Sequence, residues 1–221
     1  IKKYDELKLK TNDFILNIRV AFTKVMGDNF AAGVLASEVG MLKYGLFWWQ
    51  SGREIHPDDQ AFSTYKKSGY LAVWITFVFV ILIETTLVHF LLWRWNETVA
   101  IVATILSVYG LVFFISDLVS MIKRPLVITN GTLQLRVGIR WNTTINLKSI
   151  DKIETIKGYE REKESTVLDC SIMRDPNVRI ILNEPVVVHG LYGIRRYASN
   201  IVFNVDDEIN LIACIAKSNS Y

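Results

Sequence analysis

Two long apolar segments, separated by only a few polar residues, constrain this chain more than any other feature of its sequence. The first covers residues 71–93 and is long enough to cross a bilayer as a helix, which takes about 20 apolar residues. The second covers residues 99–116 and continues in a less apolar form to residue 122. Residues 94–98 leave room only for a tight turn. Because lipid offers no water to backbone polar groups, the two segments predict a helical hairpin that spans a membrane.

The charges beside this hairpin predict its orientation. Two lysines precede the first segment and Lys-Arg follows the second, whereas the turn has one arginine balanced by a glutamate. Basic residues collect on the cytoplasmic side of membranes, so we expect a multi-pass protein of the plasma (inner) membrane with both ends in the cytoplasm. The candidates for contact with anionic lipid are the basic residues expected near that surface: Lys66, Lys67, Lys123, Arg124, Arg195 and Arg196.

The N-terminal part, residues 1–69, predicts two amphipathic helices followed by a polar connector. The second helix, residues 30–49, has one apolar face and one face of small residues that permits close packing. Two charged residues within it make a full crossing costly. We therefore expect this helix at the membrane interface or against the hairpin, with Trp48 and Trp49 at headgroup depth. A third span is the alternative.

After residue 124 the apolar period changes from that of helices to that of strands. Short runs rich in β-branched residues alternate with turn signals, and Asn130-Gly131 between two of them is a strong hairpin signal. The expected strands are residues 125–129, 132–137, 140–147, 150–156, 167–173, 178–182, 186–189 and 200–205. Residues 206–217 predict a final amphipathic helix. These elements favour an all-β barrel or sandwich capped by that helix.

Several stretches of this region resemble a known kind of domain. The resemblance is to a bacterial pleckstrin-homology-like (PH-like) domain, and it rests on RPLVITNGTLQLRVGIRWNTTINLKSIDKIE, NVRIILNEPVVV and IVFNVDDEINLIACI. The hairpin, through AFSTYKKSGYLAVW and IETTLVHFLLWRW, resembles that of uncharacterised bacterial integral membrane proteins that carry this domain. The resemblance implies a binding or scaffolding role without enzymatic activity. The resemblance covers roughly residues 60–217. We therefore divide the chain into N-terminal amphipathic or interfacial helices with their connector at 1–69, a transmembrane hairpin at 70–122 and a cytoplasmic PH-like domain at 123–221.

Polar side chains inside the hairpin are the candidate site, since ionisable groups within a span are costly and often functional. Counting back from the turn places Glu84 opposite Ser107 or Tyr109. The same count places His89 opposite Thr104. We interpret these residues as a polar clasp that holds the two helices together. A proton or ion pathway in an oligomer, or contact with a partner subunit, stays open as an alternative.

The sequence shows no catalytic or metal-binding pattern. Its histidines, His56, His89 and His189, fall in a connector, a span and a strand, and its two cysteines match no metal spacing. The formal net charge of +3 is too small to favour nucleic acid as a partner. We therefore expect no metal, no cofactor and no enzymatic activity.

Together these features predict a membrane-anchored, non-catalytic binding or scaffold protein. It would present a cytoplasmic domain to a protein or lipid partner, or to a second copy of the chain, beside the bilayer that holds it. The alternative is a small oligomeric transport or channel component that uses Glu84 and His89 inside the membrane.

Overall fold

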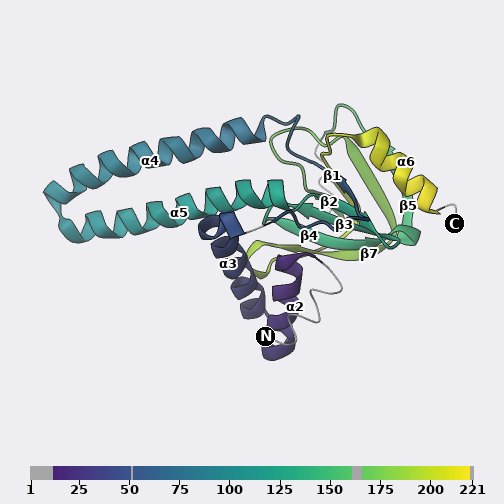
Figure 1. Ribbon diagram of the computed structural model, residues 1–221, viewed down its shortest axis with the longest axis horizontal. Coiled ribbons are helices and arrows are strands. Elements are labelled where there is room, and N and C mark those ends of the chain that lie inside the picture. The colour runs from purple at the N-terminus through teal and green to yellow at the C-terminus, as the bar shows by residue number, and fades with distance from the viewer. Residues whose placement is uncertain (1–11, 51, 161–165, 220–221) are drawn as a thin grey trace.

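The computed structural model describes residues 12–50, 52–160 and 166–219. A long helical hairpin projects from a mixed β-sheet, and two shorter N-terminal helices lie beside the base of the hairpin (Figure 1). The last helix lies at the end of the molecule opposite the hairpin tip. The hairpin is thus a projection whose root meets the sheet and the N-terminal helices.

Helices α4 (Tyr70–Trp95) and α5 (Glu97–Lys123) form the hairpin. Asn96 alone separates them: its N–H donates to the Leu92 carbonyl at 2.7 Å, and its side chain accepts from the Val99 N–H at 3.1 Å. Both helices are long and apolar enough to cross a membrane, and only 6% of the apolar window in each is buried. The predicted helical hairpin is confirmed, and both helices extend slightly beyond the expected apolar segments.

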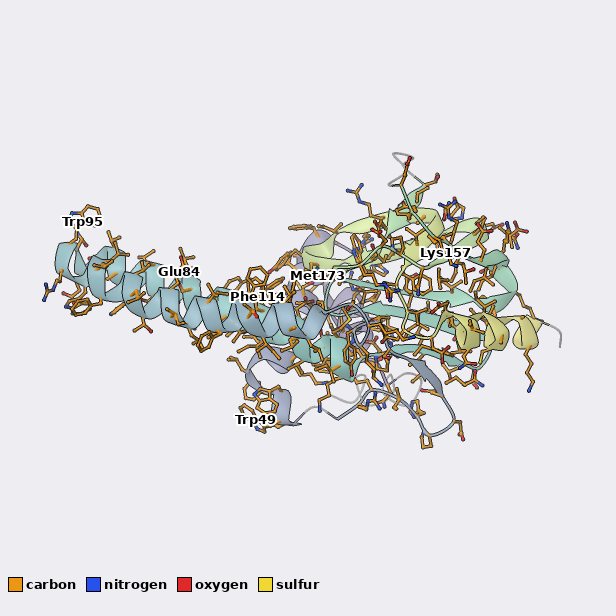
Figure 2. All side chains as sticks on the ribbon, turned by 90° about the horizontal axis from the view of Figure 1, so that it is seen from above. Trp49, Glu84, Trp95, Phe114, Lys157 and Met173 are labelled. Atoms are coloured by element: carbon orange, nitrogen blue, oxygen red, sulfur yellow. The ribbon has the colours of Figure 1, made fainter. Side chains whose placement is uncertain are left out.

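The exposed part of the hairpin matches a bilayer in length. The Trp74 and Phe114 rings, with centroids 5.6 Å apart, pack where the two helices leave the core. From Trp74, α4 continues to Trp95 at the tip (Figure 2). This stretch is about 32 Å long at 1.5 Å per residue, and the hydrocarbon core of a bilayer is about 30 Å thick.

Eight strands form one sheet. They are β1 (Gln60–Phe62), β2 (Leu126–Thr129), β3 (Thr132–Val137), β4 (Trp141–Asn146), β5 (Ile150–Thr155), β6 (Val167–Asp169), β7 (Val178–Gly190) and β8 (Arg195–Phe203). Their order is β1-β2-β3-β4-β7-β8-β6, with β5 also paired to β7. The sheet is mixed because β6 runs parallel to β8. Helix α6 (Glu208–Asn219) packs Leu211 and Ile215 into the core.

The sheet is open, which corrects the expected barrel or sandwich. Its strand path ends at β1 and β6, and no pairing joins these two strands within the described parts of the chain. Each has three residues, whereas closing a barrel needs strands long enough to tilt and stagger around it. The architecture is therefore an α/β fold with two long helices, an open sheet and a C-terminal helix.

Local pairing also differs from the sequence-based expectation. Residues 178–182 and 186–189 belong to one strand, β7, whose register against β8 shifts between Ile181 and Val186. Pro185 lies within this shift, where the ladder has no need of the N–H that proline lacks. Strand β1 has no sequence signal, and its pairing with β2 extends the sheet by one edge strand from the polar connector.

The N-terminal helices are α2 (Phe14–Met26) and α3 (Phe30–Leu46), and the short helix η1 (Trp48–Gln50) follows them. Each of the two α-helices begins at a side-chain cap, the preference of Asp and Asn at this position. Asp13 accepts from the Leu16 N–H at 3.0 Å, and Asn29 accepts from the Ala32 N–H at 2.8 Å. Both helices therefore start close to where their sequence periodicity begins.

Helix α3 contacts α2, α5 and the short helix η3 (Leu191–Gly193) between β7 and β8. A small core of Ile15, Tyr44 and Ile139 fills the space between α2, α3 and the turn after β3. The N-terminal helices thereby cover one end of the sheet beside the root of the hairpin.

Candidate functional site

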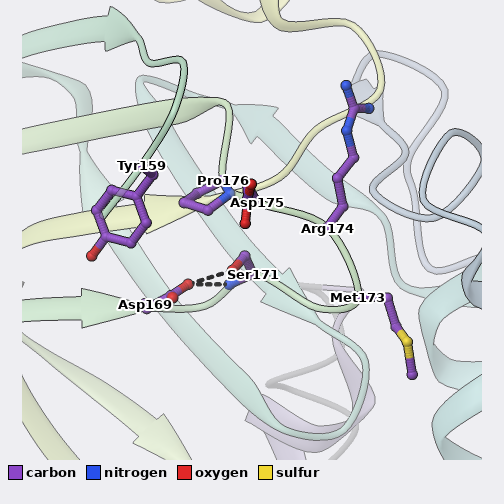
Figure 3. Close-up of a pocket in the computed structure, with 7 residues that line it drawn as sticks. All are labelled: Tyr159, Asp169, Ser171, Met173, Arg174, Asp175 and Pro176. Carbon is purple, nitrogen blue, oxygen red and sulfur yellow. Dashed lines mark hydrogen bonds between the residues drawn. The ribbon is translucent and has the colours of Figure 1, made fainter. Parts of the chain in front are cut away.

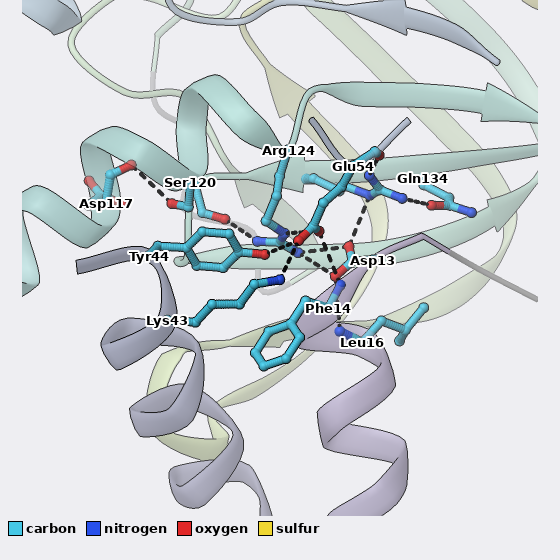
Figure 4. A network of polar contacts seen from close by, with 12 residues as sticks. Asp13, Phe14, Leu16, Lys43, Tyr44, Glu54, Asp117, Ser120, Arg124 and Gln134 are labelled. Atoms are coloured by element: carbon cyan, nitrogen blue, oxygen red, sulfur yellow. Dashed lines mark hydrogen bonds and ion pairs between the residues drawn. The ribbon is translucent and has the colours of Figure 1, made fainter. Parts of the chain in front are cut away.

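A network of buried charges lies where the hairpin, the N-terminal helices and the sheet meet (Figure 4). Asp13, which caps α2, accepts hydrogen bonds from Arg124 Nη2 at 2.8 and 3.0 Å. It also lies 2.9 Å from Arg136 Nε. Arg124 is the C-cap of α5 and Arg136 belongs to β3. The three side chains are at most 3% exposed, so one carboxylate joins three elements in the interior.

Glu54, from the connector before β1, is the second carboxylate of this network. Its Oε1 accepts from the Tyr44 hydroxyl and lies 3.1 Å from Lys43 Nζ, both on α3. Its Oε2 accepts from the Phe14 N–H at 3.1 Å and lies 3.6 Å from Arg124 Nε. The connector is therefore bound to α2, α3 and the end of α5 by a single side chain.

The two arginines decide the charge of Asp13. Burial alone would raise its pKa, but the positive charges of Arg124 and Arg136 outweigh burial and hold the pKa at about 2. Burial and the charge of Glu54 raise the pKa of Tyr44, so its phenol keeps the proton that it donates. At neutral pH the network consists of paired charges and one fixed donor, an arrangement that positions structural elements.

A third buried carboxylate, Asp117 on α5, joins both hairpin helices to the sheet. It accepts from the Tyr70 hydroxyl at 2.5 Å and from Arg140 Nη2 at 2.7 Å. The Arg140 guanidinium in turn lies 5.0 Å from the centre of the Trp74 ring, within the range of a cation–π contact. Gly138, after β3, has φ of 55°, and a Cβ there would lie 2.6 Å from Asp117 Oδ1. The hairpin therefore enters the domain through a tightly packed joint.

Within the hairpin, His89 and Thr104 face each other. His89 Nδ1 lies 2.5 Å from Thr104 Oγ1, which donates its own hydrogen to the Ala100 carbonyl at 2.8 Å. Since a hydroxyl has one hydrogen, we assign the proton of this contact to His89 Nδ1. The contact lies where counting from the turn places it, and it links α4 to α5 near the tip.

The structure does not join Glu84 to Ser107 or Tyr109, the partners that the expected clasp assigns to it. Glu84 is exposed on the hairpin (Figure 2), without a hydrogen bond to either residue in the described structure. Tyr109 instead donates to Glu38 Oε1 on α3 at 3.0 Å, with the Tyr192 hydroxyl 3.1 Å away. Two residues turn a helix by about 200°, so Ser107 and Tyr109 point in opposite directions. Residue counting predicts depth along the hairpin but not direction around the helix.

The basic residues proposed for lipid contact lie in different environments. Lys66, Lys67 and Arg196 are exposed, and Lys123 is half-buried. Arg195 pairs with Asp28 in the loop before α3. Arg124 is buried in the network described above and is not available to lipid. The chain turns inward after α5, which a count of basic residues near a span cannot reveal.

A surface pocket of about 500 Å³ lies beside β6 (Figure 3). Its lining comprises Tyr159, Asp169, Ser171, Met173, Arg174, Asp175 and Pro176. Ser171 donates to Asp169 Oδ1 through its N–H at 2.9 Å and its hydroxyl at 2.5 Å. Among the described residues that line it, none is a histidine or lysine that could activate the serine.

Metal-ligating side chains do not gather in the parts of the chain that the structure describes. No group of three or more His, Cys, Asp or Glu residues there is placed to hold a metal ion. The histidines lie apart, and His189 Nδ1 lies 3.1 Å from Arg19 Nη1. Burial and the charges of Arg19 and Arg195 lower the pKa of His189 to about 4. This imidazole is thus neutral at pH 7 and is part of the contact between α2 and β7.

No family model, curated protein or solved structure matches this chain. The architecture itself is two long apolar helices in a hairpin, followed by a mixed sheet and a C-terminal helix. The functional interpretation rests on the exposed apolar hairpin and on its joint with the folded domain.

The buried network cannot be recognised from the sequence because its members are far apart in the chain. Asp13 and Arg124 are 111 residues apart, and Arg136 appears in the sequence as an ordinary strand residue. Asp13 does stand directly before an apolar helical segment, which is the signal of an N-cap. Nothing comparable distinguishes Glu54 from the other charged residues of the connector.

Proposed function

We propose that the protein is a membrane-anchored, non-catalytic scaffold whose α4–α5 hairpin lies in the bilayer and whose sheet domain is offered to a partner at the membrane surface. The observation that carries this proposal is the exposure of the hairpin. Large apolar side chains project from it into open space, among them Ile75, Phe79, Leu87, Phe90, Leu91, Ile105 and Leu106. Exposed apolar surfaces of this extent mark membrane or protein interaction sites.

The ends of the exposed stretch support a membrane environment. Trp93 and Trp95 are exposed near the tip, with Arg94 between them. Tryptophan and arginine are typical of the boundary between hydrocarbon and water. At the other end, the joint around Asp117 and the buried charge network hold the domain in a defined position on the hairpin. A rigid joint of this kind suits a domain that is presented from a membrane rather than tethered loosely to it.

Charge supports the orientation that we propose, and the resemblance supports a binding role. The exposed Lys66 and Lys67 lie immediately before α4, which favours a cytoplasmic domain by the positive-inside rule. The resemblance to PH-like domains, which bind proteins and lipids, supports a binding role for this side. A protein, a lipid or a second copy of the chain are the candidate partners.

Arginine substitutions in the hairpin test the membrane anchor. A chain with Leu87→Arg and Leu106→Arg is expected to leave the carbonate-washed membrane fraction, because each arginine in a span costs about 2.5–3.5 kcal/mol. The wild-type chain should stay in that fraction. The matched control is Ile209→Arg on α6, an exposed apolar residue far from the hairpin, which should not change fractionation. If the wild-type chain is extracted by carbonate, the anchor proposal is wrong.

A second candidate function, an oligomeric transport or channel component, is favoured by Glu84. This carboxyl group is exposed midway along an apolar helix, where lipid contact is costly and contact with another copy is not. In that case ion flux into liposomes that contain the protein should disappear with Glu84→Gln and persist with Thr86→Val, a neighbouring exposed residue. Flux that is absent from wild-type liposomes would dismiss this candidate.

A further inference from the structure

Helix α3 turns its small residues inward and its large apolar residues outward. Gly33, Gly40 and Gly45 are all buried. A Cβ on Gly33 would overlap the backbone of Gly193 in η3, and one on Gly45 would lie 2.7 Å from a Val112 side-chain carbon on α5. The close packing of α3 against the protein is therefore made by its small face.

The opposite face of α3 is exposed in the described structure. We define the α3 stripe as Leu35, Leu42, Leu46 and Trp49, which are 39%, 42%, 43% and 63% exposed. Their spacing of seven, four and three residues places them along one side of the helix and its η1 extension. In a helix of a water-soluble domain this side would be polar, so the stripe requires a different environment.

Both charged side chains of α3 are bonded to partners within the protein. Lys43 bonds to Glu54 in the buried network, 3.8 Å from the centre of the Phe14 ring. Glu38 accepts a hydrogen bond from Tyr109 on α5. Both charges that make α3 a costly span are therefore bonded to partners in the protein, although Glu38, three residues after Leu35 and four before Leu42, borders the stripe.

The position of α3 relative to the hairpin points to one environment. Figure 1 shows α3 running across the hairpin near its root, rather than along it, on the hairpin side of α2. Its contacts with α5 fall between Tyr109 and Ser116, next to the level at which Trp74 and Phe114 mark the start of the exposed stretch. When the hairpin crosses a bilayer, a helix placed here lies in the plane of the headgroups.

We propose that the α3 stripe docks into the headgroup–acyl boundary of the phospholipid bilayer that holds the hairpin. The proposal rests on the proposed membrane anchor. Helices with one apolar face bind this boundary and bury that face by about 5–10 Å. Trp48, 50% exposed beside Trp49, adds a second ring of the type that prefers the interface.

The consequence is an orientation of the sheet domain. With the hairpin as its one anchor, the domain can tilt relative to the membrane plane. A second apolar contact, off the hairpin axis, fixes this tilt and determines which side of the sheet faces the lipid. Helix α6, at the end of the molecule opposite the hairpin tip, is then directed away from the bilayer and left accessible to a partner.

Spin labels in nanodiscs of phosphatidylcholine and phosphatidylglycerol test the docking. The full chain carries Cys214→Ser, Cys170 stays because it is buried, and a nitroxide is attached at Leu42→Cys. Reference labels are placed at Leu106→Cys on the hairpin and at Lys148→Cys on η2 (Leu147–Ser149), an exposed residue near α6. Collisions with oxygen, which concentrates in lipid, are compared with collisions with a nickel chelate, which stays in water.

The expected oxygen-to-nickel ratio at position 42 is several-fold above that at 148 and below that at 106. A ratio equal to that at 148 means that the stripe faces water and overturns the proposal. Low collision rates with both reagents mean that a protein surface or a second copy covers the stripe, which also overturns it. If the label at 106 itself behaves like the one at 148, the hairpin is not in lipid, and the anchor fails together with the docking.

Discussion

Replacing Asp13 with alanine is expected to lower the free energy of unfolding by about 3–5 kcal/mol, since it breaks a buried ion pair and leaves the other charges uncompensated. Arg124 and Arg136 would stay in an interior where neither is more than 3% exposed, with Glu54 as the carboxylate that remains near Arg124. The hydrogen bond by which Asp13 caps α2, accepted from the Leu16 N–H, would be lost as well. The measurement is chemical unfolding of the detergent-solubilised chain, followed by tryptophan fluorescence.

The matched control for this substitution is Asp28→Ala. Asp28 pairs with Arg195, but its side chain is 61% exposed, and exposed ion pairs contribute at most about 1 kcal/mol. If the two variants lose similar stability, the buried network does not hold the domain to the hairpin as we describe.

The same carboxylate predicts a dependence of stability on pH. The pKa of Asp13 is about 2 in the folded chain, below the ordinary value of 3.8. A lowered folded-state pKa gives stability that is complete above the ordinary value and is lost as the pH falls from there toward about 2. Unfolding of the wild-type chain should therefore become easier across this interval, and Asp13→Asn should reduce that change.

Substituting alanine for Gly33 is expected to cost about 1–3 kcal/mol, the range for overpacking a close contact. The added Cβ would overlap the Gly193 Cα, and Gly193 cannot move easily because its φ of 78° belongs to a turn. Helix α3 should then separate from η3. Amide hydrogen exchange reports this directly, since the Tyr192 N–H donates to Ser37 Oγ at 2.9 Å and should exchange faster in the variant.

Gly110→Ala provides the comparison for Gly33→Ala. Gly110 lies in α5, where an added Cβ would meet nothing within 4 Å, and alanine in an open helical position is about 1 kcal/mol better than glycine. This variant should be neutral or more stable, with Tyr192 exchange unchanged. Equal destabilisation by both substitutions would show that helix composition, and not the α3–η3 contact, is responsible.

Several elements of the fold could be predicted from the sequence because their causes are local. The apolar runs of α4 and α5 are longer than those of a helix that packs only one face on the core of a water-soluble domain. Asn96 ends the first helix and caps the second. The turn between β2 and β3 contains Asn130 and Gly131 with φ of 44° and 72°. These left-handed values are what an Asn-Gly hairpin turn requires. The spacing of apolar residues, the length of an apolar run and the residue types of a turn all depend only on residues that are close together in the sequence.

The direction of side chains was predictable only in part. His89 and Thr104 were found from their distance to the turn, since the helices of a tight hairpin run side by side. Tyr109 was misplaced, because its direction depends on how α5 is rotated, and α3 contributes the acceptor Glu38. A position along a helix follows from the sequence, whereas its face follows from what packs against it.

What the sequence by itself determined is the apolar hairpin, most strand positions and the two faces of α3. Only the tertiary structure decided that the small face of α3 is buried, that the Leu35–Trp49 face is exposed, and that the sheet stays open. It also decided that Asp13 meets Arg124, 111 residues away. The physical reason is that periodicity records which side chains share a face, but burial and ion pairing depend on contacts between segments distant in the chain. For this protein those contacts converge at the root of the hairpin.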